Sequence, residues 1–143
     1  MECEIINNID KQYNFKEDVV CNIISTLSKK ENQNFKSLNI IVSDDNHLNN
    51  LKKEYFNIDH FTDIISFNLE EKGDPIEGEI YISMDRIEDN ANKYEVTIEN
   101  EFKRILVHGL LHLVGYDDLT LKEKEDMKIQ EDYYLKKHTS KII

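Results

Sequence analysis

The sequence contains little cysteine, proline or glycine: two, one and four residues respectively among 143, and it has no tryptophan. The two cysteines, Cys3 and Cys21, do not form a CxxC pair, and two are too few for a disulfide framework. We therefore expect a protein of the reducing cytosol.

A long hydrophobic run is also missing. Nowhere do about 18 consecutive apolar residues occur, as a membrane-spanning helix would need. The sequence begins Met-Glu-Cys-Glu, without the basic leader of an exported protein. We expect a soluble, cytoplasmic protein with no membrane partner.

Basic residues are outnumbered by acidic ones, 18 to 29, which gives a net charge of −11. This charge disfavours broad nonspecific adhesion to nucleic acid or to an anionic membrane, but it leaves room for a local basic groove. The sequence favours ordinary solvated side chains over such a groove, for which the candidates are Lys52, Lys53, Lys103, Arg104, Lys136, Lys137 and Lys141.

The chain length fits a single domain spanning residues 1–143. Strands are expected at about 3–9, 38–43, 64–67 and 79–83, and helices at about 15–29, 48–56, 84–92, 97–114 and 120–134. The stretch holding Gly73, Pro75 and Gly78 is expected to be a loop or a wide hairpin. The pattern predicts an α+β fold, a small mixed sheet of about four strands with about five helices. The helix at 97–114 is apolar around most of its circumference and should be central.

That helix carries the most informative segment, His108-Gly-Leu-Leu-His112-Leu-Val-Gly115-Tyr-Asp-Asp118. Two histidines four residues apart lie on one helix face. Gly115 is suited to end the helix in a left-handed turn, so that a carboxylate three residues later can return to the imidazoles. Two nitrogens and one oxygen leave a position for water, as in catalytic zinc sites. Burial on this helix is expected to lower the pKa of both imidazoles and favour their neutral, metal-binding form.

The spacing matches the zinc-protease pattern HExxHxxGxxH and favours Asp118 as third ligand, although the adjacent Asp117 could turn inward instead. Asp117 could also orient a ligand imidazole or cap the next turn. The glutamate base of that pattern is absent, because Gly109 stands in its place. A peptidase would need a base from elsewhere, such as Glu79 or Glu101, whereas a metal could still polarise a phosphoryl oxygen.

The segment HGLLHLVGYDD resembles the signature of the YbeY family of bacterial endoribonucleases, written H-G-x-L-H-L-x-G-Y-D-H in most members. Two further blocks follow the family order. Thr62-Asp63-Ile-Ile-Ser66-Phe67 is similar to its T-D-V-L-S-F strand, and Gly78-Glu79-Ile-Tyr-Ile-Ser to its G-D-I-x-I-S strand. The likeness covers about residues 38–135. Thr62 and Ser66 are expected to hold the strand edge and cleft wall, with substrate contact as the alternative.

The resemblance implies a metal-dependent, single-strand-specific endoribonuclease that matures the 3′ end of 16S ribosomal RNA and acts in ribosome quality control. It implies one zinc ion per chain, with other divalent ions as alternatives, bound by His108, His112 and Asp118, which would act in catalysis through the metal. The implied partners are ribosomal RNA and the small ribosomal subunit, together with a ribosomal protein or an assembly GTPase.

The sequence departs from the family pattern at two places. Asp118 replaces the third histidine of the motif, and a harder oxygen ligand is expected to weaken zinc affinity or to broaden metal choice toward manganese. An arginine that follows an aromatic residue just before the T-D block in most members is replaced by Tyr55-Phe56. Lys52 or Lys53 is the candidate to contact RNA phosphate in its place, and the alternative is that both are merely solvated.

Two other functions remain open from the sequence. One is a zinc-dependent, peptidase-like hydrolase that uses the same three ligands. The other is a non-catalytic ribosome assembly factor with a structural metal, which the missing arginine and the acidic net charge favour.

Overall fold

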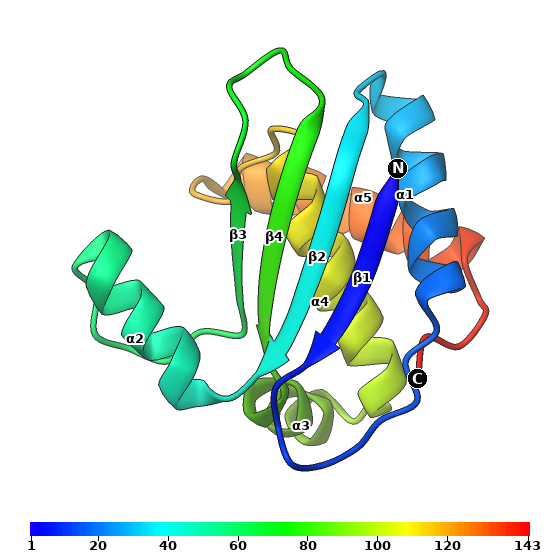
Figure 1. The fold of residues 1–143 in the computed structure, drawn as a ribbon. Coiled ribbons are helices and arrows are strands. Elements are labelled where there is room, and N and C mark those ends of the chain that lie inside the picture. The colour runs from blue at the N-terminus through cyan, green and yellow to red at the C-terminus, as the bar shows by residue number, and fades with distance from the viewer.

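The structure is a computed structural model that describes residues 1–143, and it contains four strands and five helices (Figure 1). In chain order these are β1 Glu2–Asn7, α1 Glu17–Glu31, β2 Phe35–Ser43, α2 Asp45–Phe56, β3 Ile64–Asn68, β4 Ile76–Ser83, α3 Met84–Tyr94, α4 Ile98–Leu113 and α5 Leu121–Lys137. Every expected element is present, which confirms the α+β prediction. The main errors are at strand ends: β2 starts at Phe35, and β4 starts at Ile76 and so includes Gly78, which was expected in the loop.

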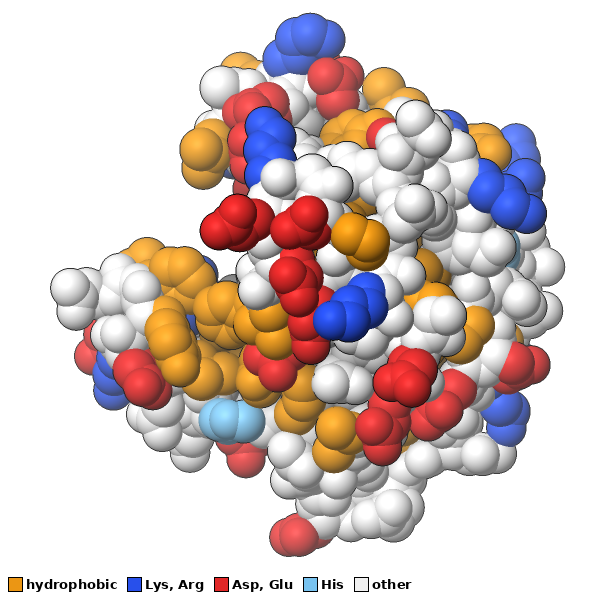
Figure 2. Space-filling view, turned by 45° about the horizontal axis from the view of Figure 1, so that its top comes forward, with side chains coloured by type: hydrophobic (Ala, Val, Ile, Leu, Met, Phe, Trp, Pro, Cys, Tyr) orange, Lys and Arg blue, Asp and Glu red, His pale blue; other side chains and the backbone are white.

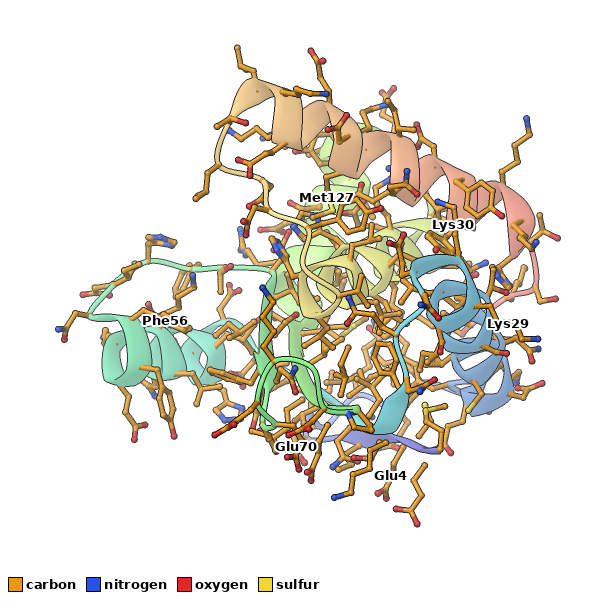
Figure 3. All side chains as sticks on the ribbon, turned by 90° about the horizontal axis from the view of Figure 1, so that it is seen from above. Glu4, Lys29, Lys30, Phe56, Glu70 and Met127 are labelled. Atoms are coloured by element: carbon orange, nitrogen blue, oxygen red, sulfur yellow. The ribbon has the colours of Figure 1, made fainter.

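The four strands form one mixed sheet in the order β1-β2-β4-β3, with β1, β2 and β4 parallel and β3 antiparallel to β4. Side chains alternate between its two faces. Leu38 and Ile40 of β2 and Ile80 of β4 are fully buried on one face, whereas Glu79 and Tyr81 lie on the other and are half-buried. Seen from above, α1 and α4 cover the same face of the sheet, and α5 lies beyond α4 (Figure 3).

Helix α4 lies at the centre of the core, as its composition predicts. Phe102, Leu106 and Leu110 have no exposed surface, and they pack with the buried residues of α1, β2 and β4. A helix that is apolar on most sides must be surrounded in this way, because its hydrophobic surface is otherwise left in water. Side chains on α4 that are not apolar therefore lie in partly desolvated surroundings.

Helix α5 begins with a capping box, as the sequence predicts. The Thr120 hydroxyl accepts a hydrogen bond from the backbone N–H of Glu123, and the Glu123 carboxylate accepts one from the N–H of Thr120. Such a cap contributes about 1 kcal/mol to helix stability. It fixes the start of α5 at Leu121, three residues after Asp118.

None of the helices is both long enough and apolar enough to cross a membrane.

Candidate metal centre

The two histidines of α4 face each other through their Nε2 atoms, which are 3.1 Å apart. Each Nδ1 atom already has a partner: that of His108 lies 2.7 Å from the Glu131 carboxylate, and that of His112 lies 2.9 Å from the backbone carbonyl oxygen of Tyr116. Ionised carboxylates and carbonyls only accept hydrogen bonds, so both Nδ1 atoms carry the proton. In the neutral rings, two Nε2 lone pairs then point at each other.

Gly115 turns the chain back toward these nitrogens. Its φ of +109° lies in the left-handed region, where glycine is favoured, and it follows Val114, the C-cap residue of α4. The returning chain places Asp118 Oδ2 3.3 Å from His108 Nε2 and 3.6 Å from His112 Nε2. Three acceptor atoms thus converge on one point.

The separations fit one face of a tetrahedral metal site. Ligands at about 2.0–2.1 Å from a zinc ion are about 3.3 Å from one another at the tetrahedral angle. The three observed separations run from 3.1 to 3.6 Å. Three acceptors held this close repel one another unless a cation lies between them, and only three protein atoms converge, so a fourth position stays open.

Of the two adjacent carboxylates, the structure brings Asp118 to the histidines and leaves Asp117 exposed. The suggestion that Asp117 orients a ligand imidazole does not hold, because Glu131 and the Tyr116 carbonyl occupy both Nδ1 atoms. Glu131 lies in α5, 23 residues beyond His108, and nothing in local spacing identifies it.

The expected fall in imidazole pKa is wrong for His108. Burial does act to lower its pKa, but the hydrogen bond to Glu131 and the charges of Glu131, Asp118 and Asp63 outweigh burial, so the pKa is raised above its ordinary value. In the metal-free protein, a proton therefore competes for the site more strongly than burial alone predicts.

Gly109 lies where α4 approaches β3 most closely. A Cβ atom there would lie 2.5 Å from Ile64 Cδ1 and 2.9 Å from Ser66 Oγ, and the Ser66 hydroxyl donates a hydrogen bond to the Gly109 carbonyl oxygen at 3.2 Å. The glutamate of the HExxH pattern therefore has no space at this position. Ser66 holds the strand edge against α4, as expected.

A cleft of about 1020 Å³ runs along α4 and α5 and has His108 and Asp118 in its wall. Glu101 and Asp63 also line it, and burial raises the pKa of each carboxyl above its ordinary value. Asp63 was missed as a candidate, although it stands in the Thr62-Asp63 block. Glu79 is excluded as a base for this site, because it lies on the opposite face of the sheet, where Tyr81 donates a hydrogen bond to it.

Most of the basic residues that were candidates for a groove are paired with acidic residues or lie outside the cleft. Lys103 is 3% exposed, forms an ion pair with Glu99, and donates to the carbonyl oxygens of His138 and Ser140. Arg104 lines the cleft but is paired with Glu131 and Asp132 at 2.9 and 2.7 Å. Lys136 and Lys137 are exposed, and only Lys141 of the tail candidates lines the cleft.

The expected substitutes for the missing arginine lie on α2. Lys53 pairs with Asp59 at 3.6 Å, and Lys52 Nζ lies 5.2 Å from the centre of the Phe56 ring. Phe56, which is 46% exposed, stacks on Phe67. Figure 2 shows hydrophobic side chains gathered over the lobe on the left that carries α2. Neither lysine lines the cleft beside His108.

Comparison with known proteins finds one matching family and several relatives with similar sequences. The family model described as endoribonuclease YbeY matches residues 4–139. Proteins named endoribonuclease YbeY include those of Cytophaga hutchinsonii, 41% identical over 86% of this chain and 87% of the relative, and Flavobacterium psychrophilum, 37% identical over 86% and 92%. That of Chlorobium phaeobacteroides is 32% identical over 96% and 94%. The solution structure of TM1509 from Thermotoga maritima is similar, with a TM-score of 0.61 and 26% identity over 94% of this chain and 87% of that one.

Proposed function

Because this chain belongs to the endoribonuclease YbeY family, we propose that it is a metal-dependent endoribonuclease that cleaves single-stranded RNA. One observation supports the metal dependence above all others: Nε2 of His108, Nε2 of His112 and Oδ2 of Asp118 lie within 3.6 Å of one another, and in the neutral rings both Nε2 atoms are acceptors because both Nδ1 atoms donate elsewhere.

The proposed substrate is ribosomal RNA, and the proposed role is maturation of the 3′ end of 16S ribosomal RNA and ribosome quality control. This function implies contact with the small ribosomal subunit, with a ribosomal protein or an assembly GTPase as a further partner, in the cytoplasm. Residues 1–143 would act as a single domain, in keeping with a family match from residue 4 to residue 139.

The proposed cofactor is one zinc ion per chain, held by His108, His112 and Asp118, with manganese as the alternative that an oxygen ligand favours. When bound, such an ion activates water or stabilises the charge that develops on a phosphoryl group. Glu131 and the Tyr116 carbonyl fix the tautomers of the two histidines, so that both Nε2 atoms are available to bind a metal.

Proton transfer must come from a group other than the glutamate of zinc proteases, since Gly109 leaves it no space. Asp63 and Glu101 are the candidate acceptors. Both line the cleft next to His108, and burial raises the pKa of each carboxyl, which brings it nearer to the value that general base catalysis needs. Lys53 remains the candidate contact to RNA phosphate on α2.

The test is cleavage of matched single-stranded RNA, duplex RNA and unstructured peptide with added zinc or manganese. We expect only single-stranded RNA to be cut, and His112→Ala to lower the rate at least about 100-fold, because it removes a ligand. His60→Ala, at an exposed histidine outside the site, is the matched control and should leave the rate unchanged. Peptide cleavage with intact RNA would contradict the proposal.

A non-catalytic assembly factor is the second candidate, and it is favoured by the aromatic pair Tyr55-Phe56 where the family motif has a cation. It predicts that His112→Ala restores growth of a deletion strain as fully as the unaltered protein does. Failure of that variant, together with normal binding to the small ribosomal subunit, would favour the enzyme.

A further inference from the structure

Three ionisable groups outside the ligand set form a continuous chain behind the metal centre. Glu131 Oε2 lies 2.7 Å from His108 Nδ1, and Glu131 Oε1 lies 2.9 Å from Arg104 Nη1. Arg104 Nη2 continues to Asp132 Oδ1 at 2.7 Å. The two helices α4 and α5 are therefore linked by charge-assisted hydrogen bonds that end at a metal-facing imidazole.

We propose that Glu131 is a positioning residue for the metal centre, which fixes the ring of His108 with Nε2 toward the ion and is itself held by Arg104. This inference rests on the proposed metal site of His108, His112 and Asp118. It adds two residues, Glu131 and Arg104, to the groups that determine metal affinity.

The geometry of Glu131 suits this role. Its side chain is 10% exposed, so water cannot replace it as the partner of His108 Nδ1 without rearrangement. Each carboxylate oxygen has one partner, a ring N–H on one side and a guanidinium on the other. A carboxylate behind a ligating imidazole fixes its tautomer and makes the opposite nitrogen a better donor to a metal.

Arg104 explains how a charged carboxylate can remain in this place. A nearly buried negative charge is costly unless it is paired, and the planar guanidinium provides the pairing together with the imidazole. Arg104 also binds Asp132, which is half exposed and does not touch either histidine. The adjacent carboxylates Glu131 and Asp132 thus share an arginine, but only one of them reaches the metal centre.

This difference gives a matched pair of variants. Glu131→Gln removes the charge behind His108, and Asp132→Asn removes an equal charge from the same arginine without changing any contact to a histidine. In each variant Arg104 keeps one carboxylate partner, so the fold is expected to persist. Thermal unfolding of the metal-free proteins checks this directly.

The experiment measures zinc and manganese affinity of the unaltered protein and both variants by competition with a chelating dye. We expect Glu131→Gln to raise the zinc Kd about 10- to 100-fold and Asp132→Asn to change it by no more than about twofold. Equal affinity of Glu131→Gln and the unaltered protein would overturn the role of Glu131. Failure of the unaltered protein to bind either ion would instead overturn the metal site itself.

A second measurement needs no variant. In protein labelled with ¹⁵N-histidine, long-range ¹H–¹⁵N spectra distinguish the two ring nitrogens of His108. We expect Nδ1 to be protonated and Nε2 to be unprotonated at neutral pH with zinc bound. Zinc coordination through Nδ1 would overturn the proposal even if Glu131→Gln proved unstable.

Discussion

Asp118, the proposed third ligand, stands at the last position of the motif that this segment resembles, where the resemblance leads us to expect a histidine. Its Oδ2 lies 3.3 Å from His108 Nε2 and 3.6 Å from His112 Nε2, so the carboxylate is close enough to complete the proposed ligand set. Compared with a histidine at this position, the atom that would bind the metal is an oxygen and not a nitrogen. A carboxylate is a harder and negatively charged ligand, and it suits manganese as well as zinc.

Replacement of Asp118 tests this directly. Asp118→Ala should weaken zinc binding by at least about 100-fold, because only two protein ligands remain. Asp118→His should bind zinc and should raise the preference for zinc over manganese, because it exchanges an oxygen for an imidazole nitrogen. Isothermal titration with each ion measures both effects. Asp117→Ala serves as the control at the exposed neighbour, and loss of metal in that variant instead would assign the ligand to residue 117.

The protonation of His108 gives a second residue-level prediction. Metal binding requires a free Nε2, and the pKa of His108 is raised from its ordinary value of 6.5 by Glu131, Asp118 and Asp63 against the effect of burial. Above the raised pKa the ring is neutral and binds the ion, whereas below it a proton occupies Nε2. Zinc affinity should therefore begin to fall at a pH above 6.5 as the solution is acidified. A titration from about pH 8 to about pH 5 measures this, and constant affinity down to pH 6 would contradict it.

Among the elements, the pair α4 and β3 determines what chemistry the site can support. Gly109 allows the helix to lie against Ile64 and Ser66, and the same closeness excludes a glutamate base beside His108. Gly109 thus affects both the packing of α4 against β3 and the absence of a glutamate base next to His108.

Gly109→Ala should destabilise the protein by about 1 to 3 kcal/mol, because the added methyl group overpacks this contact. Ile64→Val removes the Cδ1 atom that lies 2.5 Å from the new Cβ, so the double variant should recover part of the loss. Urea unfolding of the two single variants and the double variant measures the coupling. Strictly additive effects would show that Ile64 is not what limits the approach of α4 to β3.

Across the whole molecule, Lys103 and Glu99 of α4 hold the segment after α5 over the core. Lys103 donates to two carbonyl oxygens of that segment, and Glu99 accepts from the backbone N–H groups of Ile142 and Ile143. Ile142 is fully buried, and its carbonyl oxygen accepts from Lys16 N–H just before α1. The C-terminal segment is therefore joined both to α4 and to the residue that precedes α1.

Lys103→Met should lower the free energy of unfolding by about 3 to 5 kcal/mol, because it leaves the Glu99 charge without its buried partner. Lys136→Met, at an exposed lysine of α5, should change it by less than about 0.5 kcal/mol. Chemical unfolding monitored by circular dichroism compares the two. A small effect at Lys103 would indicate that the segment after α5 is not held by this ion pair.

The sequence predicts the fold well because its elements have strong local patterns. The period of α4, the capping box at Thr120 and the turn at Gly115 each act within a few residues, and each is present in the structure. The ends of β2 and β4 were less predictable, because Phe35 and Gly78 join the sheet through pairing between strands that are distant in sequence.

The same distinction separates the predicted part of the site from the missed part. His108, His112 and Asp118 lie within 11 positions and could be grouped by spacing. Glu131 of α5 and Asp63, just before β3, reach the centre only through packing of α5 and β3 against α4, and their charges help to raise the pKa of His108 where burial alone predicts a fall. Residue spacing alone could not predict the effect of charges that are distant in the sequence on the pKa of His108.

Zinc K-edge absorption spectroscopy on the zinc-loaded protein tests the central claim most directly. We predict one ion with two imidazole nitrogens at about 2.0–2.1 Å and a carboxylate oxygen at about 2.0–2.2 Å, and loss of the oxygen contribution in Asp118→Ala. A shell containing sulfur, or one that is unchanged when His108 and His112 are replaced, would contradict the assignment of this centre.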